Sequence, residues 1–219
     1  MTCGLFLLGA VVGYLFGSLP FSWWVVRATR SIDMRHYGSR TVSAALVGVL
    51  VSKPAAALVG LLDIAKGFVP AAIGYRLMPD NPLLAGTIGL AALLGHCWPA
   101  WLGFHGGRGI SVTIGTLLVL FPWGVLWILL ALGLGQLARA GAVFVLVSLG
   151  TLPVLAALFH RPSGVVVICA LFFLVVIAKR LEANREPLPP KGKGVVLLRR
   201  LLLDRDIKDW SAWFGRRPQ

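Results

Sequence analysis

The sequence predicts an all-α fold: a polytopic membrane protein with seven transmembrane helices, a short interfacial helix and a C-terminal amphipathic helix. Of the 219 residues, 58% are hydrophobic and 13% are charged, and the mean hydropathy is +0.84, which is too apolar for a soluble domain of this length. The apolar residues form runs that can cross a bilayer core about 30 Å thick. The net charge of +13 is concentrated in a few polar segments, as in the cytoplasmic loops of membrane proteins.

The first apolar run, residues 5–26, is long enough to span the membrane. Pro20 removes a backbone hydrogen bond, so we expect a kink near the end of this helix. Residues 27–40 then carry four arginines and one acid, Asp33. The positive-inside rule places this loop in the cytoplasm and the N-terminus outside. Residues 41–51 are apolar but too short to cross, which predicts an interfacial or re-entrant helix.

Further apolar runs alternate between the two sides of the membrane. Those of full length are residues 54–75, 83–102, 141–159 and 164–178. Residues 110–138 are interrupted at Pro122 and form either one kinked span or two short ones. Two crossings keep the basic residues 179–185 in the cytoplasm, so we predict two. The total is then seven, with the C-terminus inside.

The chain becomes polar after residue 179, which predicts two parts: a transmembrane domain, residues 1–186, and a basic cytoplasmic tail, residues 187–219. Prolines stiffen the start of the tail. Residues 195–214 have the pattern of one amphipathic helix. Such a helix is expected to bind anionic phospholipid or to dock on another membrane-protein subunit. No basic soluble domain is predicted, so nucleic acid is not an expected partner.

A glycine-rich segment between two apolar runs is the main candidate site. Gly106, Gly107 and Gly109 allow a tight backbone turn that can bring N–H groups together, and Arg108 stands among them. The helix expected from Ile110 would direct the positive end of its dipole to the same place. We therefore predict a site for an anion, with phosphate as the expected group. The alternative is a flexible connecting loop.

Two charged residues lie inside a predicted span. Asp63 and Lys66 are three positions apart and share one helix face. Charges within a membrane are usually paired or functional, so either a structural ion pair or a substrate contact is expected. The cysteines are far apart and give no metal spacing, and no hydrolase-type Ser-His-Asp order is present. We predict no metal and no cofactor.

Several short motifs together resemble one family. They are Gly17-Ser18-Leu19-Pro20-Phe21, then Asp33-Met34-Arg35 with Gly38-Ser39, then Asp63-Ile64-Ala65-Lys66-Gly67, and finally Gly95-His96 with Pro99, Phe104 and Gly106-Gly107-Arg108-Gly109. In these residues the chain resembles the bacterial acyl-phosphate-dependent glycerol-3-phosphate acyltransferases, the PlsY family, over residues 5–185. The family has seven transmembrane helices, which agrees with the topology predicted above.

The resemblance implies a function in phospholipid synthesis. An acyl chain moves from acyl phosphate to the 1-hydroxyl of glycerol 3-phosphate, without a metal, at the bacterial cytoplasmic (inner) membrane. The catalytic candidates are His96 and Ser39. The substrate-binding candidates are Ser39, Arg40, Lys66, Gly106, Gly107, Arg108 and Gly109. Because both substrates carry phosphate, positioning and charge stabilisation are expected to dominate the catalysis.

The chain is a divergent member by this comparison. The family's second motif reads Gly-Ser-Gly-Asn-x-Gly-Ala-Thr-Asn, with an Arg two residues later; here residues 38–46 lack both asparagines, and Val49 replaces that Arg. Two serines expected after Arg139 are missing. The family's Arg-His-Arg-x-Asn-Ile segment is replaced at residues 179–184. Two other functions therefore stay open: a catalytically degenerate homologue serving as a structural or lipid-binding subunit of a membrane complex, and a lipid or anion transporter.

Overall fold

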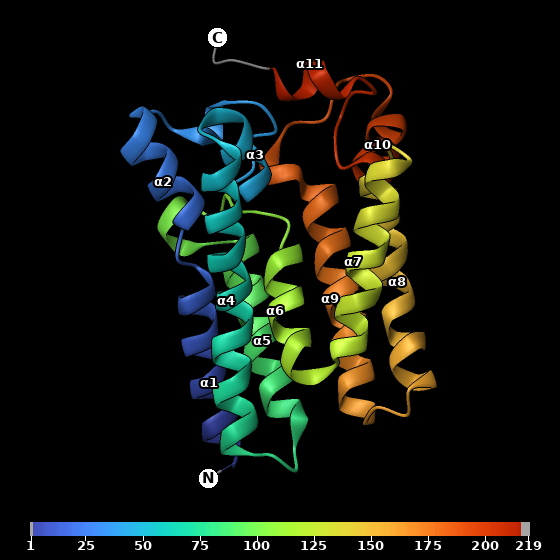
Figure 1. The fold of residues 1–219 in the computed structure, drawn as a ribbon. Helices are drawn as coiled ribbons and strands as arrows, with labels where there is room; N and C mark the ends of the chain where they lie inside the picture. The colour runs from blue at the N-terminus through green and yellow to red at the C-terminus, as the bar shows by residue number, and fades with distance from the viewer. Residues whose placement is uncertain (1, 216–219) are drawn as a thin grey trace.

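In the computed structural model, residues 2–215 are described, and they form helices joined by turns. The helices of the bundle are α1 (Thr2–Gly17), α4 (Lys53–Leu77), α5 (Pro82–Cys97), α6 (Ile110–Leu120), α7 (Pro122–Leu137), α8 (Gly141–Leu158) and α9 (Ser163–Glu182), which run side by side in Figure 1. Within the described residues, five helical segments are long and apolar enough to cross a membrane, and α6 and α7 are shorter apolar helices. The chain is thus a multi-pass membrane protein, as predicted.

The remaining helices gather at the end of the bundle opposite the N-terminus (Figure 1). They are α2 (Phe21–Arg30), α3 (Ala44–Leu50), α10 (Lys193–Leu203) and α11 (Trp210–Phe214), with single 3-10 turns η1 (Met34–His36), η2 (Ala100–Leu102) and η3 (Ala183–Arg185). The seven-residue α3 agrees with the predicted short interfacial element. We call this end of the bundle the capped end. The side of the membrane that it faces stays a prediction from the positive-inside rule.

The first predicted span is not one kinked helix. It is two helices, α1 and α2, separated at residues 18–20. Pro20 takes the N-cap position of α2 and has no N–H to continue the hydrogen bonding of α1. The short α2 leans outward from the axis of α1 at the edge of the capped end, as Figure 1 shows. The spanning part of this region is therefore α1, and the arginines at the end of α2 belong to the capped end.

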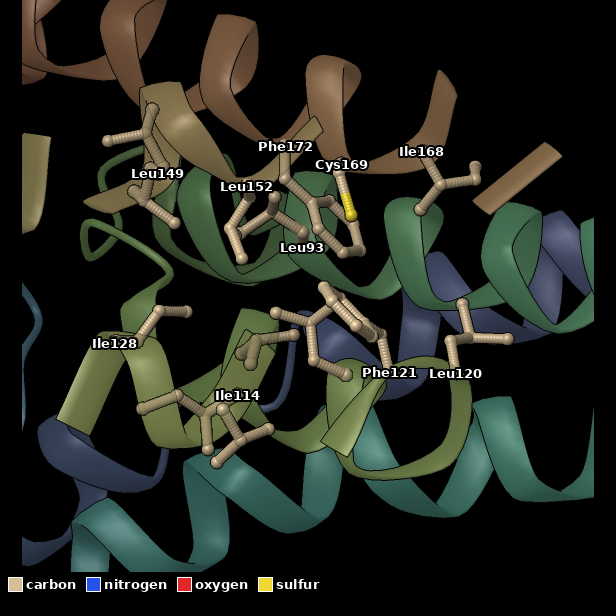
Figure 2. Packing of buried hydrophobic residues seen from close by; sticks show 14 of the residues in the cluster. Leu93, Ile114, Leu120, Phe121, Ile128, Leu149, Leu152, Ile168, Cys169 and Phe172 are labelled. Atoms are coloured by element: carbon tan, nitrogen blue, oxygen red, sulfur yellow. The ribbon is translucent and has the colours of Figure 1, made fainter. Parts of the chain in front are cut away.

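The run over residues 110–138 forms two antiparallel helices, as the charge argument predicted. Helix α6 ends at Leu120 and α7 begins at Pro122, so Phe121 alone separates them. Proline suits the first turn of a helix because the N–H that it lacks would have no partner there. Phe121 is fully buried and lies between α6 and the side chains of α8 and α9, including Leu152 and Phe172 (Figure 2).

One apolar core joins the helices from α5 to α9. Leu93 of α5, Ile114 of α6, Ile128 of α7, Leu149 of α8 and Cys169 of α9 belong to the same buried cluster (Figure 2). The neighbouring helix pairs make closer contact through small residues. An added Cβ at Gly17 would stand 2.0 Å from the backbone oxygen of Ala92, and one at Gly67 would stand 2.0 Å from that of Val112. Small residues allow such close approach between membrane helices.

The predicted amphipathic helix over residues 195–214 is also two helices, α10 and α11. Asp204 ends α10 in the left-handed conformation, with φ at 54°, a region that Asp tolerates better than most residues. Arg200 then draws the chain back by bonding Asp206 through Nε at 2.7 Å and Nη2 at 3.0 Å. The tail therefore folds onto the capped end of the bundle, where α10 contacts α8 and α9.

Candidate functional site

The capped end contains a cavity of about 750 Å³. Its wall combines residues from the second motif, α4, α5, the glycine loop (residues 103–109), α6, the α7–α8 turn, α9 and the tail. The polar and charged residues that line it are Ser39, Thr41, Ser43, Asp63, His96, Arg108, Ser111, Gln136, Arg139, Arg180, Asp204 and Arg205. A cavity with apolar walls and a few convergent polar groups is the usual form of a small-molecule site.

Four of the predicted catalytic and substrate-binding residues line this cavity: Ser39, His96, Arg108 and Gly109. The Ser39 hydroxyl is 2.7 Å from that of Thr41, which is 2.9 Å from that of Ser43. The second motif therefore presents a row of hydroxyl groups. Ser43 also accepts the N–H of Leu46 at 3.4 Å, so it caps α3 and fixes this row on a helix end.

Arg108 is the best-placed cation of the predicted set. Its side chain is 12% exposed, and its Nε is 2.6 Å from Oδ1 of Asp204. Nη1 donates to the backbone oxygen of Lys179 at 3.1 Å. These two contacts hold the guanidinium from two sides, while Nη2 makes no hydrogen bond to a described residue. An arginine held in this way keeps a pair of N–H donors for a phosphate oxygen in the cavity.

A buried ionic cluster lies below the cavity. Asp63 and Lys66 form the predicted ion pair, with 2.8 Å between carboxylate and ammonium and each side chain 3% exposed. His96 places Nδ1 3.7 Å from the same carboxylate oxygen. Asp63 and His96 line the large cavity, whereas Lys66 faces a small pocket beside Ser18.

The glycine loop wraps the C-terminal end of α5. Gly107 donates its N–H to the backbone oxygen of His96 at 3.1 Å, and Gly106 donates its N–H to Oδ1 of Asn184 at 3.3 Å. A Cβ at Gly107 would stand 2.2 Å from Nε2 of His96. These two glycines serve close packing against α5, and their N–H groups are already used. The expected convergence of their N–H groups on an anion is therefore not what the loop presents. Gly109 remains at the cavity wall, beside the N-terminus of α6.

Asn184 connects three separate segments. Its amide nitrogen donates to the backbone oxygens of Arg40 at 3.0 Å and Gly106 at 3.1 Å. Since the side chain is 6% exposed, these bonds fix the second motif and the glycine loop relative to α9. Arg40 itself has a positive φ of 55° and points to Glu186, 2.6 Å away, and it does not line the cavity.

A second ion pair holds the loop that precedes the second motif. Arg35 bonds both carboxylate oxygens of Asp33, its Nε at 3.0 Å from each, and donates from Nη1 to the backbone oxygen of Leu102 at 3.1 Å. Burial raises the pKa of Asp33, but the hydrogen bonds and charge of Arg35 outweigh it and lower that pKa to about 2. The loop is therefore tied to the chain just before the glycine loop.

Sequence reasoning missed four charged residues of the cavity: Arg139, Arg180, Asp204 and Arg205. Arg180 could have been found: the family motif separates its first Arg from its Asn by four positions, and Arg180 and Asn184 have that spacing. The family segment therefore corresponds to residues 180–185, one position later than residues 179–184. Among the described residues, no group of three or more His, Cys, Asp or Glu side chains could hold a metal ion.

Comparison with known proteins decides the family. A family model described as glycerol-3-phosphate acyltransferase matches residues 7–187. The chain belongs to the glycerol-3-phosphate acyltransferase family. It is 32% identical to glycerol-3-phosphate acyltransferase 5 of Dehalococcoides mccartyi, over 96% of this chain and 93% of that protein. It is 35% identical to the glycerol-3-phosphate acyltransferase of Maricaulis maris, over 82% of each chain.

The fold of the family agrees with this structure. The crystal structure of PlsY, an integral membrane glycerol 3-phosphate acyltransferase, in its glycerol 3-phosphate form, superposes with a TM-score of 0.78. The match covers 94% of this chain and 96% of that chain at 24% identity. The helical membrane fold predicted from the sequence is thus the fold of the acyltransferase family. The match to the family model ends at residue 187, whereas the match to the Dehalococcoides mccartyi relative covers 96% of this chain and therefore includes part of the tail.

Proposed function

We propose that this protein transfers the acyl group of an acyl phosphate to the 1-hydroxyl of glycerol 3-phosphate, an early step of phospholipid synthesis. The observation that carries this is the cavity at the capped end, where residues from separate family motifs, Ser39, His96, Arg108 and Gly109, form one wall. In a chain related over nearly its whole length to acyltransferases, such a cavity is the expected place for the reaction.

The reaction needs positioning and charge stabilisation. The hydroxyl oxygen of glycerol 3-phosphate attacks the acyl carbonyl carbon, the bond from that carbon to the phosphate oxygen breaks, and the hydroxyl proton ends on the released phosphate. Negative charge develops on the carbonyl oxygen and on the leaving phosphate. Arg108, with free Nη2 donors, and the N-terminus of α6 beside Gly109 are placed to stabilise that charge.

The two catalytic candidates have complementary chemistry. The hydroxyl of Ser39 can donate a hydrogen bond to the carbonyl or phosphate oxygen, while Thr41 and Ser43 hold it in a row. His96 lies at the base of the cavity beside Asp63, where it can accept the hydroxyl proton before that proton passes to phosphate. Lys66 forms an ion pair with Asp63, and Arg40 forms one with Glu186 after α9. Both residues therefore support the site from outside the cavity.

We place the capped end at the cytoplasmic face of a bacterial inner membrane, with the N-terminus outside. The support is charge: the basic residues in the last turns of α2 and α9 lie at that end. Acyl phosphate has an apolar chain and a charged head. A cavity at the end of a membrane bundle allows the chain to stay among apolar helices while the head meets arginine.

The experiment is turnover by the purified protein. Palmitoyl phosphate and radiolabelled glycerol 3-phosphate are expected to give lysophosphatidic acid, and Arg108→Ala is expected to lower kcat/KM by at least tenfold, the scale of one charge-assisted hydrogen bond. Lys208→Ala, an exposed tail cation, is the matched control. Absence of product with correctly folded wild-type protein would refute the proposal.

The second candidate is a catalytically silent homologue that binds lipid or a membrane partner. It is favoured by one observation: Val49 and Arg40 stand at second-motif positions where the family has Arg and Gly, and Arg40 points away from the cavity. Binding of anionic phospholipid that is weakened by Arg108→Ala, without turnover, would support this candidate.

A further inference from the structure

The tail completes the wall of the cavity, although the match to the family model ends before it. Asp204, Arg205 and Trp213 come from this segment, and each lines the cavity that also holds Ser39 and Arg108. Trp213 is 3% exposed. A loosely attached tail could not shield a tryptophan to this degree, so the segment belongs to the folded body of the protein.

Two buried arginines fix the tail at this place. Arg200, 2% exposed, donates to the backbone oxygens of Leu181 at 3.2 Å and Glu186 at 3.0 Å. Arg180 donates from Nη1 to the backbone oxygen of Leu201 at 2.8 Å and from Nη2 to that of Ala142 at 2.9 Å. These bonds attach the end of α10 to α9 and α8. They therefore set the position of the turn at residues 204–206 that follows.

Arg205 has no structural partner that explains its place. Its Nε is shielded from solvent and has no hydrogen-bond partner, and no hydrogen bond or ion pair joins its side chain to any residue in the range 2–215. Asp209 is the acid on which its charge acts, but that residue is exposed and caps α11. A guanidinium keeps its charge, and a shielded donor without a partner is costly. An anion in the cavity would satisfy it.

Asp204 forms an ion pair with Arg108, a second arginine that lines the cavity. Its carboxylate lies 2.6 Å from Nε of Arg108 and is 26% exposed. This ion-pair contact lies on the Nε side of the guanidinium, so Asp204 orients the group while its Nη2 donors stay available. The charges that line the cavity are four arginines and two acids, Asp63 and Asp204, of which Asp63 is paired with Lys66. The wall therefore keeps an excess of positive charge.

We propose that the C-terminal segment is part of the substrate site: Arg205 binds a substrate phosphate beside Arg108, and Asp204 is a positioning residue that holds Arg108. This rests on the proposed function, since both substrates of that reaction carry a phosphate. The dianionic phosphate would lie between the two guanidinium groups, in the cavity that the hydroxyl row of the second motif also lines.

The test compares Arg205→Ala with Lys208→Ala, which removes an exposed cation three residues away. Arg205→Ala is expected to raise KM for one of the two substrates by about 10- to 100-fold, the effect of losing a charge-assisted hydrogen bond, and Arg205→Lys is expected to recover part of it. KM is measured separately for glycerol 3-phosphate and for palmitoyl phosphate, so the substrate affected identifies the phosphate. Equal KM values in Arg205→Ala and Lys208→Ala would overturn the proposal.

Asp204→Asn is compared with Asp80→Asn, which makes the same change at an exposed position in the turn between α4 and α5. If Asp204 positions Arg108, its loss raises KM several-fold and Asp80→Asn does not. A fall in KM for either substrate would overturn the positioning role, because it would mean that the carboxylate competes with phosphate for Arg108. Circular dichroism of each variant excludes misfolding as the cause of a change.

Direct binding separates this proposal from the proposed function. Thermal stabilisation by inorganic phosphate is measured for the wild type, Arg205→Ala and Lys208→Ala, because a ligand that binds the folded state raises the melting temperature. If the wild type shows no turnover, and only Arg205→Ala loses the stabilisation by phosphate, the acyltransferase proposal is refuted and the tail site is supported. Turnover with equal phosphate stabilisation in all three proteins would refute the tail site and leave the acyltransferase standing.

Discussion

Replacing Lys66 by methionine tests the ionic cluster below the cavity. The change keeps the length of the side chain and removes the ammonium that lies 2.8 Å from the Asp63 carboxylate. At that distance and an effective dielectric constant of about 20, the attraction is about 6 kcal/mol before desolvation is subtracted. Since both side chains are 3% exposed, water cannot replace the lost partner. Breaking one side of such a buried pair costs about 3–5 kcal/mol.

The assay is thermal unfolding of the purified protein in detergent, followed by circular dichroism. For a chain of this size a loss of 3–5 kcal/mol corresponds to a fall in Tm of roughly 6–20 °C. Lys53→Met, at the exposed start of α4, is the matched control and is expected to leave Tm unchanged. The double variant Asp63→Asn with Lys66→Met leaves no unpaired charge and is expected to be more stable than Lys66→Met alone. A Tm for Lys66→Met within 1 °C of the wild type would refute this reasoning.

Three further predictions use other contacts. Gly67→Ala is expected to cost about 1–3 kcal/mol of unfolding free energy, because its Cβ would meet a backbone oxygen of α6. Gly133→Ala, where a Cβ has open space, is the control in the same thermal unfolding experiment. Equal stability of the two variants would contradict the packing argument. Asn184→Ala is expected to raise KM and to lower Tm, because three backbone groups of the glycine loop and the second motif lose their buried partner. Unchanged kinetics would show that this bridge is dispensable. Arg35 lowers the pKa of Asp33 from 3.8 to about 2, so the contribution of Asp33 to stability is complete above about pH 4 and is lost as pH falls toward 2. Asp33→Asn is expected to make Tm less dependent on pH across that interval. The same dependence of Tm on pH in this variant as in the wild type would contradict the prediction.

Much of the fold follows from hydropathy and charge. The spans around α4, α5, α8 and α9 were predictable because each is a long apolar run between polar turns. Even the division of residues 110–138 could be predicted, since one crossing would have placed basic residues on the wrong side. The breaks at residues 18–20 and at Asp204 were not, because they depend on tertiary contacts: α1 meets α5 closely at Gly17, and Arg200 draws the chain back after α10.

The candidate site was only partly predictable. Ser39, His96 and Arg108 were found through motifs, and the fold brings them to one cavity. The role expected for Gly106 was not found, because its N–H is used by Asn184, a partner 78 positions away. Arg205 gave no signal at all in a tail rich in basic residues. Only its place in the folded chain separates it from neighbouring cations that face solvent.

The position of the tail has a consequence for how the protein is made. Residues 204–213 are synthesised after the bundle helices, yet they line the same cavity as Ser39, which is synthesised before most of them. A nascent chain whose seven bundle helices are already in the bilayer still lacks that wall. Premature termination in the tail would leave an inserted bundle with an unfinished cavity, and a fusion partner placed directly after Arg185 would have the same effect. An N-terminal fusion, at the opposite end of the bundle (Figure 1), leaves the cavity whole.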